Sequence, residues 1–146
     1  MKISTKGRYG LRAMLELAIG FGNGPVMVET IAANQGISGK YIHNLMMGLK
    51  SAGLVRAIRG PKGGYVLSRQ PSRITALDVI ESLEGKILLA DCVANTGSCA
   101  RAERCAAQDV WKDAAAAMKN VFSGVTLEEL ATKQQKKQPI HVMYHI

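Results

Sequence analysis

Three cysteines lie close together in the second half of the chain, at positions 92, 99 and 105. Converging thiolates can hold an iron–sulfur cluster, and spacings of six and five intervening residues leave enough chain to wrap around one. Arg101 and Arg104 lie in the same stretch, where their charge would offset that of a thiolate-bound cluster. There is no CxxC pair, and an odd number of cysteines argues against a set of disulfides. Cys92, Cys99 and Cys105 are therefore candidate metal ligands, with a reactive thiol or structural cysteines as alternatives.

Three thiols leave one position of a cluster without a ligand. Gln108, one helical turn beyond Cys105, is a poor ligand for iron. The other candidates in this chain are three acids near in the sequence, Asp91, Glu103 and Asp109, and three histidines, His43, His141 and His145. A residue of a partner subunit is a further possibility. His43 is more economically interpreted as a DNA contact and the last two histidines as solvated residues. The fourth ligand therefore stays unassigned.

A second set of polar residues lies on a predicted helix that Ser38 can cap. The buried face of this helix follows helical spacing and consists of Tyr41, Ile42, Leu45 and Leu49. Lys40, His43 and Asn44 fall outside that face, in the first two turns. A recognition helix presents such N-terminal residues to base edges, with lysine donating to guanine and asparagine pairing with adenine. We predict Lys40, His43 and Asn44 as base readers, with Ser38 and Tyr41 beside them at the DNA; the alternative is a solvated helix face.

A basic, glycine-rich turn follows this helix. Two short β-prone runs, residues 54–58 and 65–67, flank the turn Arg59-Gly60-Pro61-Lys62-Gly63-Gly64. A hairpin of this kind directly after a recognition helix predicts a wing, and Arg59 or Lys62 can enter the minor groove. The turn lacks both the spacing and the strand-to-helix context of a nucleotide-binding P-loop.

The first helix should hold this reading surface in place. Ser4 can cap it, an apolar stripe follows at helical spacing (Leu11, Met14, Leu15, Ala18 and Ile19), and the glycines and proline of residues 20–25 end it. Lys6, Arg8 and Tyr9, together with Arg12, can bind phosphates from this helix. A short helix over residues 29–35, broken at Gly36, then joins the Ser38 helix as a helix-turn-helix.

The second half predicts a connector and a long helix. Thr75 caps a helix that runs to Glu84 and ends at Gly85. A longer helix over residues 106–122 carries one apolar face: Val110, Trp111, Ala114, Met118, Val121 and Phe122. Thr126 and Glu129 form a capping box that opens a last short helix. We thus expect a DNA-binding domain over 1–75, a connector, cysteine loop and dimerisation helix over 76–133, and a flexible tail over 134–146.

Charge is distributed unevenly between the halves. Residues 1–75 hold eleven Lys or Arg and two acids, whereas residues 76–146 hold eight and nine. A basic half of this kind is typical of phosphate-backbone binding. The chain starts without an apolar signal region and has no apolar run of about 18 to 20 residues, so we expect a cytoplasmic protein with no membrane partner. No catalytic constellation is present, so we expect no enzyme; a small redox protein is the remote alternative.

The motifs together resemble the Rrf2 family of bacterial transcription regulators, most of all its IscR-like members, and also NsrR-like and CymR-like ones. The matching stretches cover nearly the whole chain: ISTKGRYG (3–10), QGIS (35–38), LV (54–55), RGPKGGY (59–65), the three cysteines and VTLEEL (125–130). The resemblance implies a mainly α fold with a small β-wing, a winged helix-turn-helix followed by a long dimerisation helix. It also implies a homodimeric repressor or activator, palindromic operators in double-stranded DNA, and an iron–sulfur cluster whose loss or modification alters DNA affinity.

The resemblance supports Ser38, Lys40, His43, Asn44 and Arg59 by position, although the residue types at 40, 43 and 44 differ from those of the best-known relatives. IscR-like members have a histidine where Gln108 stands, and the first cysteine spacing here is one residue longer. NsrR-like members take an acid from the partner's first helix, where this chain has Arg8. We favour a [2Fe–2S] cluster over [4Fe–4S]; the alternative is a regulator of the same fold that uses thiol oxidation or a protein partner.

Overall fold

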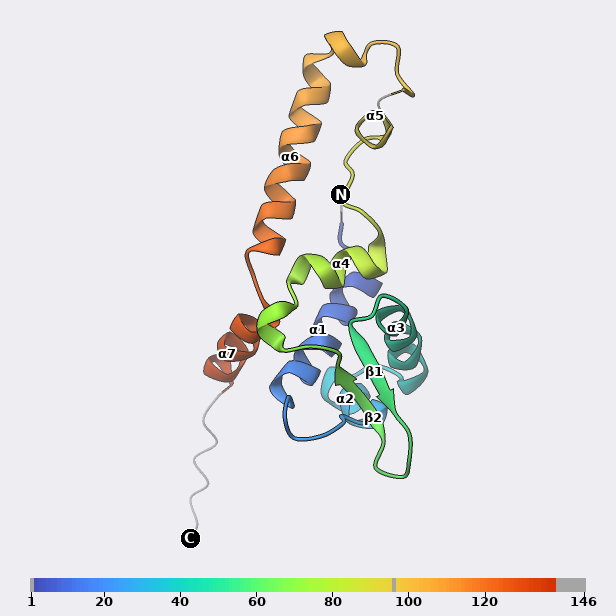
Figure 1. Cartoon of the computed structure of the whole chain (residues 1–146), viewed down its shortest axis with the longest axis vertical. Coiled ribbons are helices and arrows are strands. Elements are labelled where there is room, and N and C mark those ends of the chain that lie inside the picture. Colours follow the sequence, from blue (N-terminus) through green and yellow to red (C-terminus); the bar gives the residue numbers. More distant parts are fainter. Residues whose placement is uncertain (1, 96, 139–146) are drawn as a thin grey trace.

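The computed structural model describes residues 2–95 and 97–138, and its first part is the expected helix-turn-helix (Figure 1). Its three helices are α1 (Thr5–Ile19), α2 (Val28–Gln35) and α3 (Gly39–Ser51). The Ser4 side chain accepts hydrogen bonds from the first backbone N–H groups of α1, and Ser38 does the same for α3. Gly36 ends α2 in the left-handed region at φ 65°, a conformation that other residues adopt only with strain. The caps and the break lie where the sequence predicts them.

The wing is a two-stranded antiparallel hairpin of β1 (Val55–Ile58) and β2 (Gly64–Leu67), within one residue of the predicted runs. Residue Val26 adds a short bridge to Tyr65, with backbone hydrogen bonds of 2.9 Å in both directions. A Cβ atom at residue 64 would collide with the Val26 carbonyl, so this approach requires glycine. The wing is therefore joined to the loop that follows α1.

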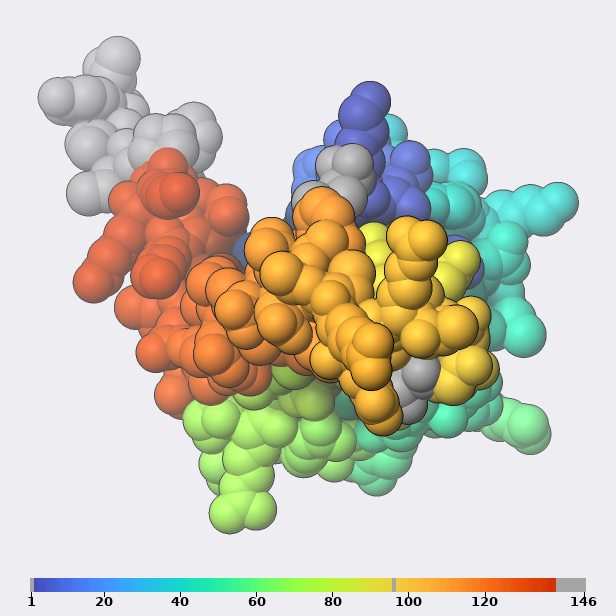
Figure 2. Space-filling view, turned by 90° about the horizontal axis from the view of Figure 1, so that it is seen from above, coloured from blue at the N-terminus to red at the C-terminus, as the bar shows by residue number. Residues whose placement is uncertain are grey.

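The second half consists of α4 (Ala76–Glu84), α5 (Asp91–Ala94), α6 (Ala106–Ser123) and α7 (Leu127–Lys137), with short 3₁₀ turns at Pro71–Arg73 and Ala102–Arg104. Helix α6 forms a long arm that projects from the body of the protein; the chain runs along it back toward the body, where α7 packs against α1 (Figure 1). In the view from above, α6 and the residues before it lie in front of the rest (Figure 2). No helix in the described part of the chain is long and apolar enough to cross a membrane.

One hydrophobic core joins the two halves. It combines α1 and α3 with the wing, α4 and α7, and its fully buried side chains include Met14, Ile42, Leu49, Val79 and Leu127. Backbone hydrogen bonds of 2.9 Å from Ala76 to Val125 and from Leu127 to Ile74 tie the start of α4 to the start of α7. The overall architecture is mainly helical with a small β-wing, as expected.

The expected tail is shorter than the sequence indicates. We placed a flexible tail over residues 134–146, but α7 continues to Lys137. The Thr126–Glu129 capping box starts this helix, its Gln and Lys residues are good helix formers, and Lys136 and Lys137 complement the helix dipole in the last turn. The remaining residues, 139–146 with His141 and His145, lie outside the described part of the chain.

Candidate DNA-binding surface and cysteine segment

Helix α3, the predicted recognition helix, is anchored by its apolar face and exposes the predicted base readers. Ile42, Met46 and Leu49 are fully buried in the core. Lys40, His43 and Asn44 are exposed, while Tyr41 is half-buried. An anchored helix with exposed polar residues in its first turns has the form that major-groove reading requires. Their contacts with bases remain a prediction.

Two tyrosines outside the predicted readers connect α3 to its neighbours. The Tyr65 hydroxyl of the wing lies 3.4 Å from Nδ1 of His43, close enough for a weak hydrogen bond that orients the imidazole. The ring of Tyr41 meets the ring of Tyr9 edge-on, with centroids 6.1 Å apart. This role of Tyr65 could not be predicted from the sequence, because the strand pattern does not reveal which side chain faces the helix.

The cations of α1 gather around Tyr9. The guanidinium carbons of Arg8 and Arg12 lie 5.5 and 5.2 Å from the centroid of the Tyr9 ring, which is within the range of cation–π interactions. Lys6 and Arg8 are exposed. Because Tyr9 also contacts Tyr41, the predicted phosphate contacts of α1 adjoin the recognition helix. Arg59 and Lys62 lie at the exposed tip of the wing hairpin (Figure 1).

The end of α4 completes the N-terminal cap of α1, a contact that the sequence analysis missed. Oε1 of Glu84 accepts hydrogen bonds from the backbone N–H groups of Ser4 and Gly7, both at 3.0 Å, and from the Ser4 hydroxyl. A carboxylate in this position also favours the positive end of the helix dipole. Glu84 thus holds the start of the helix that carries Lys6, Arg8 and Tyr9.

Glycines allow α4 to approach α1 and α3 closely. A Cβ at Gly10 of α1 would collide with Cδ1 of Leu83, and one at Gly48 of α3 would lie 3.2 Å from Cδ2 of Leu83. Leu83 therefore packs against both helices at positions without side chains. The cysteine segment (residues 86–105) begins directly after Glu84 and Gly85. Its position is therefore linked to α1 and α3 through the contact of Leu83 with both helices.

The three cysteines lie on separate elements of the cysteine segment. Cys92 is in the short helix α5, Cys99 is in the following loop, and Cys105 is the N-cap of α6. All three are free and half-buried. Within residues 2–95 and 97–138, no three His, Cys, Asp or Glu side chains come together in a way that could hold a metal ion. The donor types fit an iron–sulfur cluster, but their positions in the described chain do not assemble a site for one.

Gln108 has a different role from that of a ligand. Its side chain is only 2% exposed, and its Nε2 donates a hydrogen bond of 2.7 Å to the carbonyl oxygen of Cys92. A buried amide with a partner of this kind stabilises the contact that it makes. The residue therefore ties α5 to the first turn of α6. The sequence placed Gln108 beside the cysteines but did not reveal this bond.

The apolar face of α6 is largely uncovered. Val110, Trp111 and Val121, which we predicted to share one face of this helix, are 57%, 42% and 65% exposed. Ala115 and Gln108 are the buried residues of α6. A row of large exposed apolar side chains on a long helix is typical of a surface that binds another protein chain.

Comparison with known proteins agrees with this architecture. Residues 3–133 match the Rrf2 family, described as "Iron-dependent Transcriptional regulator". The chain is 41% identical over 144 residues to the HTH-type transcriptional regulator CymR of Bacillus subtilis, covering 99% of both chains. It is 35% identical over 135 residues to IscR of Xenorhabdus nematophila, covering 92% of this chain and 82% of that one.

Solved structures of the same two kinds of regulator are similar in fold. The structure described as CymR, the global cysteine regulator of B. subtilis, matches with a TM-score of 0.76 and 42% identity, over 91% of this chain and 98% of that one. The T. potens IscR structure matches with a TM-score of 0.77 and 34% identity, over 99% of this chain and 97% of that one. The relatives are transcriptional regulators rather than enzymes.

Proposed function

Because this chain belongs to the Rrf2 family of DNA-binding transcriptional regulators, we propose that it acts as a homodimer that reads a palindromic operator with α3 and the wing of each subunit. The observation that carries this proposal is the anchored α3 helix, which exposes Lys40, His43 and Asn44 beside a basic wing. Identical half-sites follow from two-fold symmetry, because each subunit presents the same helix to its own half-site.

The contacts divide into readers and positioning groups. Lys40, His43 and Asn44 are the proposed base readers of the major groove, while Arg59 and Lys62 of the wing enter the minor groove. The remaining proposed contacts bind phosphates and fix the register of the protein on the duplex: Lys6, Arg8, Tyr9, Ser38 and Tyr41. Ser38 and Tyr41 are placed at the start of α3, and the other three are on α1.

The proposed dimer contact is α6. Its exposed Val110, Trp111 and Val121 would leave a large apolar surface in water in a single chain. Packing against the same face of a second copy would bury these side chains, as a two-fold interface requires. We thus propose that two regions sharing one core have different functions: residues 1–75 bind DNA, and residues 76–133 form the connector and the dimer contact.

The cysteine segment is the proposed sensor. An iron–sulfur cluster at Cys92, Cys99 and Cys105, [2Fe–2S] in preference to [4Fe–4S], is supported by the iron-dependent family description and the identity to IscR. Loss or oxidation of such a cluster would change the arrangement of the cysteine segment. The positions of the thiols do not favour it, because no set of donors converges within the described residues.

Regulation through the thiols themselves, by oxidation or by a protein partner, is the second candidate. It requires only that the cysteines be free and partly exposed, which all three are. The identity to CymR, described as a global cysteine regulator, is consistent with this alternative. The geometry of the cysteine segment therefore supports thiol chemistry more directly than a cluster.

Either signal would act by shifting a population of conformations. The segment leaves α4 directly after Leu83 and Glu84, which contact α1 and α3. A change in the segment that moves the end of α4 alters the position of both helices and hence the spacing of the two recognition helices.

Selection of bound duplexes from a random pool tests the DNA-binding proposal. The expected result is a palindrome with half-sites about one helical turn apart, bound by a dimer in analytical ultracentrifugation. Recovery of single half-sites bound by monomers would contradict the dimeric proposal. Asn44→Ala and the exposed control Lys136→Ala on α7 should differ, with only the former losing selectivity.

Anaerobic reconstitution with iron and sulfide separates the two sensing candidates. A cluster predicts a coloured protein with stoichiometric iron and changed affinity for the selected palindrome. A colourless protein, together with peroxide-dependent modification of individual cysteines by mass spectrometry and a matching change in affinity, would favour thiol chemistry. Cys-to-Ser variants at 92, 99 and 105, each measured separately, identify which thiol is required.

A further inference from the structure

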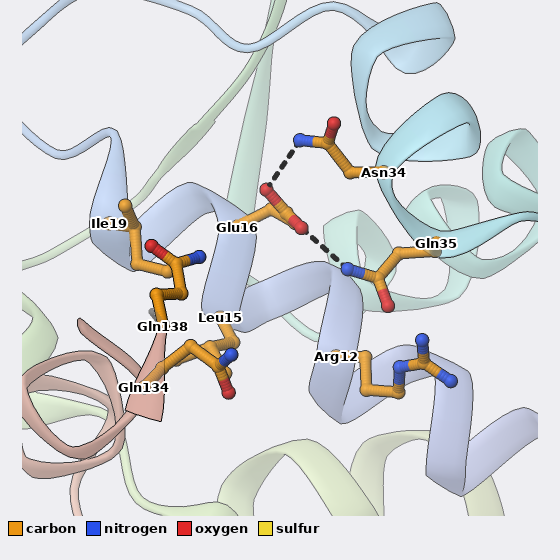
Figure 3. Close-up of a pocket in the computed structure, with 8 residues that line it drawn as sticks. All are labelled: Arg12, Leu15, Glu16, Ile19, Asn34, Gln35, Gln134 and Gln138. Carbon is orange, nitrogen blue, oxygen red and sulfur yellow. Dashed lines mark hydrogen bonds between the residues drawn. The ribbon is translucent and has the colours of Figure 1, made fainter. Parts of the chain in front are cut away.

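A polar cavity lies between α1, α2 and α7 (Figure 3), and none of its lining residues belongs to the cysteine segment. Its volume is about 550 Å³, within the range of small-molecule sites. Six of the residues that line it have polar ends: Arg12, Glu16, Asn34, Gln35, Gln134 and Gln138. Three different helices thus bring polar side chains to one cavity.

The cavity wall carries two opposite charges that are not paired with each other. Arg12 and Glu16 are one turn apart on α1, and the one ion pair found in the described residues is elsewhere, between Arg69 and Asp78. Arginine four residues before glutamate is the less favourable order for pairing within a helix. The Arg12 guanidinium instead lies over the Tyr9 ring, and the Glu16 carboxylate faces α2.

Side-chain amide groups lie around these two charged residues. Glu16 accepts hydrogen bonds from Nδ2 of Asn34, at 3.0 Å, and from Nε2 of Gln35, as the dashed lines in Figure 3 show. A carboxylate has about four acceptor positions, so Glu16 can still bind a further cation. From the opposite side, Gln134 and Gln138 bring amides that can both donate and accept.

We propose that this cavity binds a small zwitterion of the free α-amino acid class. The ligand carboxylate would pair with Arg12 and its ammonium group with Glu16, which lie one helical turn apart on α1 and both line the cavity. Gln134 and Gln138 would bind a polar side chain, and Leu15 and Ile19 form an aliphatic part of the wall. A simple anion or cation would use only one of the two charges.

Both charged residues of the cavity are connected to the DNA-reading surface. Arg12 contacts Tyr9, which meets Tyr41 of α3. Glu16 holds Gln35, the last residue of α2 before the turn of the helix-turn-helix. A bound carboxylate would also remove Arg12 from the cations available to phosphates, so occupancy should weaken DNA binding. This coupling, unlike the binding itself, rests on the proposed function.

Calorimetric titration of the full-length protein with each free L-amino acid tests the site. Matched probes are the N-acetyl derivative, which lacks the ammonium group, and the carboxamide, which lacks the carboxylate. The proposal predicts that at least one free amino acid binds. Each capped derivative should bind at least about tenfold more weakly, because each loses one charge-assisted contact. Equal binding of free and capped forms, or no binding by any free amino acid, would overturn it.

Two variants place the binding in this cavity. Glu16→Gln should weaken binding about tenfold by removing the charge, and Gln134→Ala should weaken it severalfold from the side of α7. Glu29→Gln removes the same charge from an exposed position of α2 outside the cavity and should leave affinity unchanged. Thermal melting checks that each variant is folded, and Gln134→Ala serves if Glu16→Gln is not. Wild-type affinity in both cavity variants would contradict the assignment.

Fluorescence anisotropy with a labelled palindrome tests the coupling separately. The amino acid that binds should lower the affinity for DNA in the wild type and in Glu29→Gln, and have a smaller effect in Glu16→Gln. Unchanged DNA affinity at saturating ligand would overturn the coupling but not the site. Failure to bind any duplex would instead contradict the proposed function, since calorimetry detects the ligand without DNA.

Discussion

The reading head (residues 2–75) and the cysteine segment (residues 86–105) differ in how they are held. Every helix of the reading head contributes buried residues to the core. In the described part of the chain, no buried hydrophobic residue lies between Ile80 and Ala115. Instead of buried apolar contacts, hydrogen bonds such as the one from Gln108 to the Cys92 carbonyl hold the segment.

The difference indicates which part can change at small energetic cost. Regions with few buried apolar contacts open at lower free energy than core elements do. A DNA-reading surface needs side chains held in one geometry, whereas a sensor must adopt two arrangements. In the proposed function, a change in the cysteine segment would reach the reading head through the contact of Leu83 and Glu84 with α1 and α3.

The largest expected difference is in stability. Ile42 is fully buried on α3, so Ile42→Ala should lower the free energy of unfolding by about 2–4 kcal/mol. Val93 is only half-buried in α5, so Val93→Ala should cost less than about 1 kcal/mol. Urea denaturation followed by circular dichroism measures both. Similar losses would contradict the contrast between the two regions.

Within the reading head, base readers and phosphate contacts should separate. Asn44→Ala should lower affinity for the selected operator by about 1–3 kcal/mol and relax selectivity at one base pair. Lys6→Ala should weaken specific and non-specific binding alike and reduce the salt dependence by about one counterion. Salt titrations of anisotropy distinguish the two variants, and an unchanged salt slope in Lys6→Ala would place this residue away from the backbone.

In the cysteine segment, Gln108 should matter more than the exposed residues around it. Gln108→Ala removes the bond to the Cys92 carbonyl and should cost about 1–2 kcal/mol, with faster labelling of Cys92 by a thiol reagent. Gln135→Ala, an exposed glutamine on α7, is the control. Labelling at the wild-type rate in Gln108→Ala would show that the bond does not hold α5.

The contact between the two regions should give a moderate effect. Glu84→Gln keeps an acceptor for α1 but loses the charge, so stability should fall by about 1 kcal/mol, less than for a buried carboxylate because Glu84 is exposed. The response of DNA affinity to thiol oxidation or cluster loading should also decrease. Glu128→Gln, at an exposed position of α7, is the control, and an identical response in both variants would remove Glu84 from the coupling.

The smallest effect is expected at the start of α7. The backbone N–H of Thr126 donates to Glu129 and lowers the pKa of this carboxyl below its ordinary value of 4.5. Because the pKa is lower in the folded state, the stabilisation is present above the unfolded value and is lost as the pH falls through the folded one. Glu129→Gln should therefore reduce the dependence of melting temperature on pH below about pH 4.5. An unchanged acid slope would contradict this role.

Much of the fold could be predicted because its signals are local. Ser4, Ser38, Thr75 and Thr126 cap the helices that follow them, and Gly36 ends α2, as their types indicate. The length of α7 was underestimated, since polar helix formers near a chain end resemble a solvated tail. The uncovered face of α6 followed the predicted periodicity, but periodicity does not reveal whether a face is covered by the same chain.

The sequence by itself determined the helix-turn-helix, the wing and the basic charge of the first half, because caps, periodicity and turn residues act over a few neighbouring positions. Only the tertiary structure decided that Glu84 caps α1, across 80 positions, that Gln108 bonds to Cys92, and that Arg12 and Glu16 face a common cavity. These contacts depend on how helices cross, which side-chain spacing along one segment does not specify. For the same reason, three cysteines at suitable spacing were not sufficient to predict a convergent site.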